Sequence, residues 1–145
     1  MQKITTFLWY DGKAKEAAEF YCSLFKNAKV INASPLIVNF EIEGQRFMAL
    51  NGGPQFKFTE AASLFVDCES QEEVDRLWKS LTADGGEESM CGWLKDKYGL
   101  SWQIIPRRLM ELMGDKDQAK AQRVMQAMLK MRKIEVSKLE EAARG

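Results

Sequence analysis

The chain has 145 residues, and its 21 basic and 21 acidic side chains give a formal net charge of zero at pH 7. This balance removes the electrostatic case for binding nucleic acid or an acidic membrane, and no apolar run approaches the roughly 20 residues that span a bilayer. The chain contains no histidine, which excludes the commonest metal ligand, the usual general base near neutral pH and a Ser-His-Asp triad.

The first part of the chain, about residues 1–54, has the pattern of one mixed module. It begins with a strand whose even-numbered residues share one face, Thr6 and Tyr10 among them. Apolar residues at helical spacing follow, and then three strand-like runs separated by turn residues. We therefore expect β-α-β-β-β, with the strand at 4–10, the helix at 13–25 and further strands at 29–33, 36–43 and 45–50.

The second part, about residues 55–106, repeats this order. A strand at 62–68 precedes a helix for which Ser70 and Glu73 form a capping box. Glycines at 85 and 86 end that helix, and strands at 88–95 and 99–105 form a hairpin, with a further strand near Glu87. The fold class is therefore α+β, with two β-α-β-β-β modules in residues 1–106.

The hairpin of the second module carries the clearest local signal. Asp96 and Gly99 are typical of a tight turn, because Asp bonds its own backbone and Gly accepts a positive φ. Beyond the turn, alternation places Trp102 between Leu100 and Ile104 on one face. Ser101 and Gln103 then share the opposite face.

Residues 107–145 form a helical extension of the same domain. A short helix ends at Gly114, and a stripe that includes Val124, Met125 and Met128 predicts a second helix, with a shorter one after it. Methionine stripes usually fill irregular packing gaps. Whether the stripe packs within the chain or on a partner subunit is left open by the sequence.

Several segments together resemble a known family. They are Trp9-Tyr10-Asp11-Gly12, Phe20-Tyr21, Asn51-Gly52-Gly53-Pro54, Gly85-Gly86-Glu87-Glu88, Cys91-Gly92-Trp93, Ser101-Trp102-Gln103-Ile104 and the helix around Met125 to Met131. Together they resemble the PhnB-like branch of the vicinal-oxygen-chelate superfamily, which includes glyoxalase I, extradiol dioxygenases and bleomycin-binding proteins. The resemblance implies paired modules that form a curved mixed sheet around a cavity, with helices outside. It also implies a homodimer, since four modules commonly combine in this superfamily to complete two cavities.

The resemblance also indicates where a site would lie. Thr6, Ser63 and Gln103 fall at positions that carry metal ligands in the superfamily, but all three are neutral oxygen donors and do not offset the desolvation of a transition ion. We therefore expect no metal and no cofactor. The candidate ligand-binding residues are Thr6, Tyr10, Ser63, Trp93, Ser101 and Gln103.

Other side chains have a structural and a functional interpretation. Gln103 either satisfies hydrogen bonds within the sheet or contacts a ligand. Glu41 belongs to a solvated face, or acts as a general base if it is buried with a raised pKa. Cys91 is a structural thiol or a nucleophile, although no histidine exists to activate it. Three cysteines without metal-ligand spacing favour a reducing cytoplasm.

Three functions remain from the sequence. The first is a protein that binds a small molecule in a metal-free cavity. The second is an enzyme of the superfamily with unusual or lost ligands, and the third is a dimeric scaffold with a vestigial cavity. The branch often carries a demethylubiquinone methyltransferase label. We discard that activity, because the chain lacks the glycine-rich loop after a first parallel strand that a typical methyltransferase needs.

Overall fold

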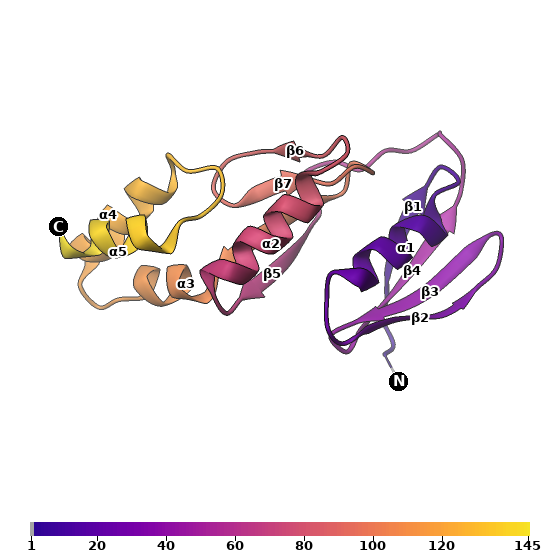
Figure 1. The fold of residues 1–145 in the computed structure, drawn as a ribbon, viewed down its shortest axis with the longest axis horizontal. Coiled ribbons are helices and arrows are strands. Elements are labelled where there is room, and N and C mark those ends of the chain that lie inside the picture. Colours follow the sequence, from indigo (N-terminus) through magenta and orange to yellow (C-terminus); the bar gives the residue numbers. More distant parts are fainter. Residues whose placement is uncertain (1) are drawn as a thin grey trace. The chain divides into compact units, whose positions relative to one another are not determined.

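The computed structural model describes residues 2–145 as two compact units (Figure 1). Unit 1 extends to Phe58, and unit 2 comprises Thr59–Gly145. Each unit holds one mixed four-stranded sheet and one long helix in the order β-α-β-β-β, so the predicted α+β class and the two modules are confirmed. The elements are β1 Thr6–Tyr10, α1 Ala14–Ser23, β2 Ala28–Ala33, β3 Ile37–Ile42 and β4 Gln45–Asn51 in unit 1, and β5 Ser63–Cys68, α2 Gln71–Thr82, β6 Glu87–Glu88, β7 Trp93–Lys95, β8 Ser101–Pro106, α3 Arg107–Met113, α4 Gln118–Met128 and α5 Val136–Arg144 in unit 2.

The sheet of unit 1 packs one face against α1. Its strand order is β1-β4-β3-β2, with β1 parallel to β4 and the other pairs antiparallel. Small residues at helical spacing, Ala14, Ala17 and Ala18, bring α1 close to the sheet, and all three are fully buried. The alternating residues of β3, among them Phe40, fill the same core. The opposite face of this sheet is the one to which Phe7 and Trp9 belong.

The end of β4 is fixed by contacts of Asn51. Its side-chain oxygen accepts a hydrogen bond from the Ala14 backbone N–H at 2.8 Å, at the first residue of α1. The indole of Trp9 donates to the Gly53 carbonyl at 2.8 Å. A Cβ at Gly52 would lie 2.4 Å from the Trp9 ring, so only glycine fits there without displacing the ring. The segment after β4 therefore packs closely against the Trp9 side chain.

The sheet of unit 2 has the strand order β5-β8-β7-β6, with β5 parallel to β8. Helix α2 covers the face that carries Trp102 and Ile104, as the alternation predicted. The Ser70 hydroxyl caps this helix by accepting from the Glu73 N–H at 3.2 Å, while the Glu73 carboxylate accepts from the Glu69 N–H at 2.8 Å. The capping interaction is confirmed, with its second bond shifted by one residue.

The expected single strand over residues 88–95 is wrong. The structure has a two-residue β6, a turn, and then β7. Cys91 and Gly92 both have positive φ in this turn, and their N–H groups donate to the carbonyls of Met131 and Arg132. A Cβ on Gly92 would lie 2.7 Å from the Ile105 side chain. Contacts with a distant loop therefore replace the local strand pairing at this point.

The three C-terminal helices pack on unit 2 within the same chain. Their core holds Leu109, Leu112, Val124, Ile134 and Leu139, and Ile105 of β8 extends into it. Part of the methionine stripe packs within the chain, because Val124 is fully buried in this core. Met125 and Leu129 of the same stripe stay exposed.

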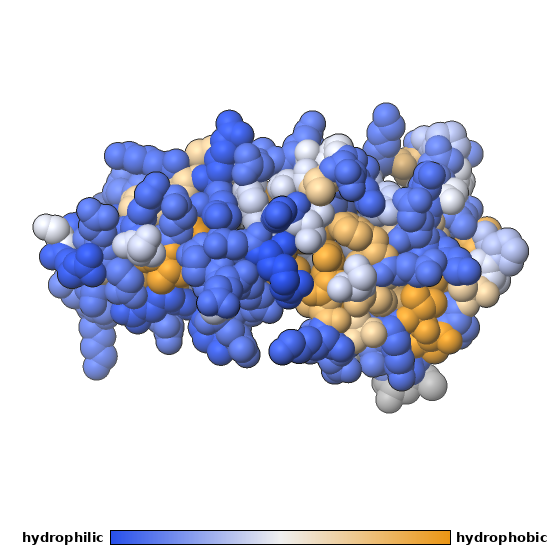
Figure 2. Space-filling model, viewed as in Figure 1, coloured by the Kyte–Doolittle hydropathy of each residue, from blue (hydrophilic) through white to orange (hydrophobic). Residues whose placement is uncertain are grey.

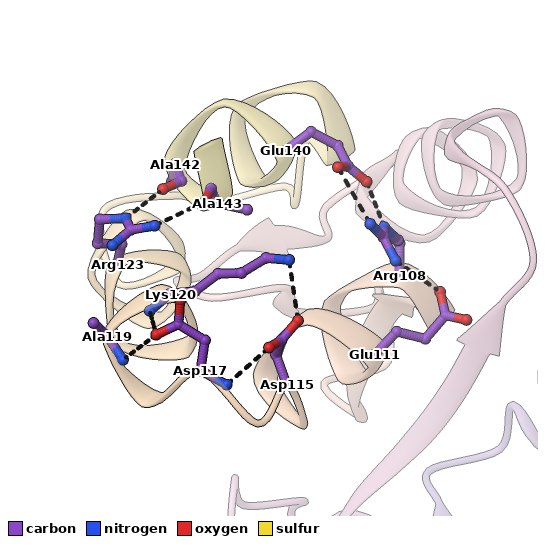
Figure 3. A network of polar contacts seen from close by, with 10 residues as sticks. All are labelled: Arg108, Glu111, Asp115, Asp117, Ala119, Lys120, Arg123, Glu140, Ala142 and Ala143. Carbon is purple, nitrogen blue, oxygen red and sulfur yellow. Dashed lines mark hydrogen bonds and ion pairs between the residues drawn. The ribbon is translucent and has the colours of Figure 1, made fainter. Parts of the chain in front are cut away.

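Polar contacts tie these helices together at the surface (Figure 3). Arg108 of α3 binds Glu140 of α5, and Arg123 of α4 donates to the last carbonyls of α5. Asp117 caps α4 by accepting from two backbone N–H groups. No helix in residues 2–145 is long and apolar enough to cross a bilayer.

Candidate ligand site on the second sheet

Four of the six candidate residues lie on one face of the sheet in unit 2. We call this the open face, defined as the face opposite the one that α2 covers. Strand register arranges its side chains in two rows across the strands. One row is Glu87, Lys95, Ser101 and Ser63, and the other is Trp93, Gln103 and Phe65.

A hollow of about 190 Å³ opens on this face. Ligand pockets for drug-sized molecules usually measure about 300–1,000 Å³, so this hollow suits a small molecule or one end of a larger one. Its lining residues come from β6, β7, β8, the connection between β6 and β7, and the segment before β5. They are Glu60, Glu87, Glu88, Ser89, Trp93, Leu94, Lys95 and Ser101.

Ser101 is the unusual residue of the hollow. Its side chain is 1% exposed, and its hydroxyl is the one buried side-chain polar atom without a hydrogen-bond partner in residues 2–145. Leaving a buried hydroxyl unpaired costs about 1–3 kcal/mol. Buried polar groups in native proteins are nearly always paired, so an unpaired one that faces a hollow needs an explanation.

Gln103 lies one strand position beyond Trp102, on the same face as Ser101. Its amide nitrogen donates to the Ser63 hydroxyl at 3.0 Å, and this is the side chain's one hydrogen bond within residues 2–145. The amide oxygen remains available as an acceptor. The hydrogen bond within the sheet is confirmed, and contact of the Gln103 amide oxygen with a ligand stays a prediction.

The turn before β8 sets the direction of these side chains. The carboxylate of Asp96 is 2% exposed and accepts hydrogen bonds from the N–H groups of Tyr98 and Leu100 and from the Trp102 indole, at 2.9, 3.1 and 2.9 Å. The sequence predicted the bond to the backbone but not the bond to Trp102. The bond to the indole holds the Trp102 side chain on the α2 side, and strand alternation places Ser101 and Gln103 on the open face.

The charged residues of the hollow were missed by the sequence reasoning. Lys95 forms an ion pair with Glu60, which raises the pKa of the Lys95 ammonium and lowers the pKa of the Glu60 carboxyl. Lys95 lies two positions after Trp93, so strand alternation could have placed both side chains on one face. Nothing local could have identified Glu60, which lies 35 positions earlier in the chain.

Glu88 also lines the hollow, but its carboxylate has other partners. It alternates with Glu87 and pairs with Leu94, which places it on the α2 side of the sheet. There its carboxylate accepts a hydrogen bond from the Trp78 indole at 2.6 Å, and the Arg132 guanidinium lies 3.9 Å from the other carboxylate oxygen.

Thr6 and Tyr10 belong to unit 1, on the sheet face that α1 covers. Tyr10 is 3% exposed, and its hydroxyl is 3.0 Å from that of Tyr21 on α1. Thr6 is exposed at the start of β1. In unit 1 the structure therefore gives Tyr10 a core position rather than a place on the open side of its sheet.

The other two residues with a possible catalytic role are in ordinary surroundings. The Glu41 carboxylate is 3.7 Å from the Arg46 guanidinium, and its side chain is 25% exposed. Cys91 occupies the turn against residues 131–132 described above. Neither residue lines the hollow.

The residues present do not fit a metal ion. In residues 2–145, no three His, Cys, Asp or Glu side chains lie close enough together to hold one. Ser63, Gln103 and Thr6 are neutral, and Ser63 and Gln103 are bonded to each other. Neutral hydroxyl and amide oxygens are poor ligands for a transition ion.

Comparison with known proteins identifies the family. Residues 2–105 match the family model described as 3-demethylubiquinone-9 3-methyltransferase. A PhnB protein from Bacillus cereus is 37% identical over 72% of this chain and 99% of its own, with a TM-score of 0.66. No curated protein matches the chain.

More distant structures share the fold. A glyoxalase/bleomycin resistance protein from Albidiferax ferrireducens has 15% identity and a TM-score of 0.52, over 70% of this chain and 95% of its own. A fosfomycin resistance protein from Listeria monocytogenes, solved with Mn(II) and sulfate, has 19% identity and a TM-score of 0.52, over 70% and 88%. The chain therefore belongs to the PhnB-like family described as 3-demethylubiquinone-9 3-methyltransferase, and it shares its fold with a glyoxalase/bleomycin resistance protein.

Proposed function

We propose that the protein binds a small polar molecule on the open face of unit 2, without a metal ion. The observation that carries this proposal is the buried and unpaired hydroxyl of Ser101 at the hollow. A ligand atom that pairs with this hydroxyl would recover the free energy lost by its burial. Gln103 would add a polar contact, and Trp93 would add apolar and aromatic surface.

Methyl transfer is not part of the proposal, despite the description of the family model. The β1–α1 connection contains one glycine, Gly12, and its neighbours are Asp11 and Lys13. A nucleotide-type cofactor site needs a glycine-rich turn that lets the backbone approach the ligand. The β1–α1 connection therefore does not provide the turn that such a cofactor site needs.

We further propose a homodimer with two-fold symmetry, located in the cytoplasm. Exposed large apolar side chains of unit 1 support an interface; they are Ile4, Phe7, Leu36 and Phe56. Figure 2 shows apolar side chains gathered on the visible face of this unit. Patches of this kind commonly mark interaction surfaces. The three cysteines are free, which supports a reducing compartment.

The experiment that tests the binding proposal compares Ser101→Ala with the unchanged protein. A thermal-shift screen of small polar molecules first identifies ligands, and calorimetry then measures their affinity for each protein. Ser101→Ala should weaken binding about 5- to 150-fold, the equivalent of 1–3 kcal/mol. The same substitution should leave the melting temperature unchanged or raise it, because it removes an unpaired buried group.

The control is Ser137→Ala, at an exposed serine in α5. This variant should bind every ligand as the unchanged protein does. If Ser101→Ala binds every ligand found with unchanged affinity, the proposed site is wrong. If the screen finds no ligand at all, the binding proposal is wrong, and a dimeric scaffold with a vestigial cavity becomes the preferred function.

A further inference from the structure

We infer that the ligand of this site carries a protonated amine. The inference rests on the proposed function and adds the chemical class of the ligand. It starts from the charges of the hollow, where the carboxylates of Glu60 and Glu87 face a single ammonium, that of Lys95. The carboxylate of Glu88 is excluded from this set, because Trp78 binds it on the other face.

The hollow has an excess of negative charge, because the Lys95 ammonium faces the carboxylates of both Glu60 and Glu87. Lys95 is held by Glu60 in an ion pair. Glu87 pairs with Lys95 across the β6–β7 ladder, so both side chains lie on the same face. Within residues 2–145, the Glu87 side chain has no hydrogen bond or ion pair of its own. An anionic ligand in the hollow would therefore meet two carboxylates and one ammonium, and that ammonium already interacts with both carboxylates.

The remaining groups are complementary to an ammonium. The buried Ser101 hydroxyl, which is the independent sign of a ligand here, has lone pairs that accept N–H bonds. Trp93 is half-buried and lines the same hollow, and an indole face attracts a cation. An ammonium supplies several donors and a positive charge at one point, so it can satisfy a carboxylate, a hydroxyl and an aromatic ring together.

The test uses three probes with the same aromatic body and different charge: benzylamine, benzyl alcohol and benzoate. Their binding is followed at neutral pH by protein-observed NMR titration, which detects weak affinities. We expect benzylamine to bind most tightly and benzoate least. Raising the NaCl concentration should weaken benzylamine binding and leave benzyl alcohol unaffected, because salt screens only the charged contact.

Glu87→Gln tests the assigned carboxylate and keeps its size. It should weaken benzylamine binding about three- to tenfold, as expected for loss of a partly exposed ionic contact, and leave benzyl alcohol unchanged. Glu72→Gln, at an exposed position in the first turn of α2, makes the same change of net charge and should have no effect on either probe.

The outcomes separate this inference from the proposed function. If benzoate or benzyl alcohol binds as tightly as benzylamine, or if Glu87→Gln changes nothing, the amine class is wrong. The same conclusion follows if benzylamine does not bind. In each case, the proposed site is retained if Ser101→Ala weakens the binding of the ligands found in the screen. If Ser101→Ala leaves their binding unchanged, both the proposed site and the amine inference are wrong.

Discussion

The amide of Gln103 donates a hydrogen bond to the hydroxyl of Ser63, 3.0 Å away, and this bond joins two parallel strands on the open face of unit 2. The pair lies beside Trp93 in the sheet, because Trp93 pairs with Gln103 across β7 and β8. A single side chain thus contributes to the sheet and presents its amide oxygen next to the hollow.

Removing the Gln103 side chain should therefore have two effects. We expect Gln103→Ala to lower the free energy of unfolding by about 1 kcal/mol, through the lost hydrogen bond, and to weaken ligands that contact the amide oxygen. Ser63→Ala removes the same bond but leaves that oxygen in place, so it should reduce stability alone. Denaturant titration and calorimetry on both variants measure the difference. Equal losses of affinity in the two variants would assign Gln103 a purely structural role.

Gln103→Glu places a carboxylate at a position where the resemblance implies a metal ligand. We expect no gain in affinity for Mn²⁺ or Zn²⁺, because residue 103 bonds the neutral Ser63 hydroxyl, and a single carboxylate beside a hydroxyl is a poor site for a transition ion. Metal analysis after dialysis, on protein without a histidine tag, measures this. A stoichiometric ion bound only by the variant would contradict this expectation.

Asp96 should be among the most sensitive residues of unit 2. Asp96→Ala would leave two backbone N–H groups and the Trp102 indole without their acceptor in a buried turn, so we expect a loss of about 3 kcal/mol or more in unfolding free energy. Asp117 offers a matched control, because it also accepts two backbone N–H bonds but is exposed at a helix start. Asp117→Ala should cost about 1 kcal/mol. Denaturation followed by tryptophan fluorescence compares the two variants.

Cys68 should make the protein less stable at high pH. Burial, with smaller contributions from the Glu73 and Asp67 carboxylates, raises the pKa of the Cys68 thiol from 9.0 to about 12. Between these values the unfolded chain loses the thiol proton and the folded chain keeps it. The free energy of unfolding therefore falls as pH rises above 9, by up to about 1.4 kcal/mol per pH unit from this group.

The comparison with Cys68→Ala isolates this effect from other groups that titrate at high pH. Stability of the unchanged protein should fall more steeply between pH 9 and pH 11 than that of the variant, as measured by urea denaturation. Iodoacetamide should label Cys68 only after unfolding, since its side chain is fully buried. Parallel pH profiles for the two proteins would contradict the raised pKa.

The proposed dimer has a direct test. Light scattering at micromolar concentration should return twice the 16.6 kDa mass of one chain, and a single-chain mass would contradict the proposal. Deletion of residues 118–145 tests the C-terminal helices separately. It would expose Ile105, Leu109 and Leu112, so we expect unfolding or aggregation. A stable, folded truncated protein would show that α4 and α5 are dispensable for unit 2.

The sequence by itself determined what depends on neighbouring residues. Alternation along β8 placed Trp102 against a helix and Gln103 on the opposite face, since successive side chains of a strand point to opposite sides. The Asp96 turn and the Ser70 cap were likewise predicted, because each depends on a side chain that bonds backbone two or three residues away.

Only the tertiary structure decided the features that depend on distant residues. The strand expected at 88–95 is broken because Cys91 and Gly92 bond a loop some 40 residues later. Glu60 became part of the site through its ion pair with Lys95. Ser101 looked like any polar strand residue; its lack of a partner appears only when surrounding segments bury it without supplying an acceptor or donor. Burial and pairing are set by the packing of the whole unit, and a local pattern does not contain that information.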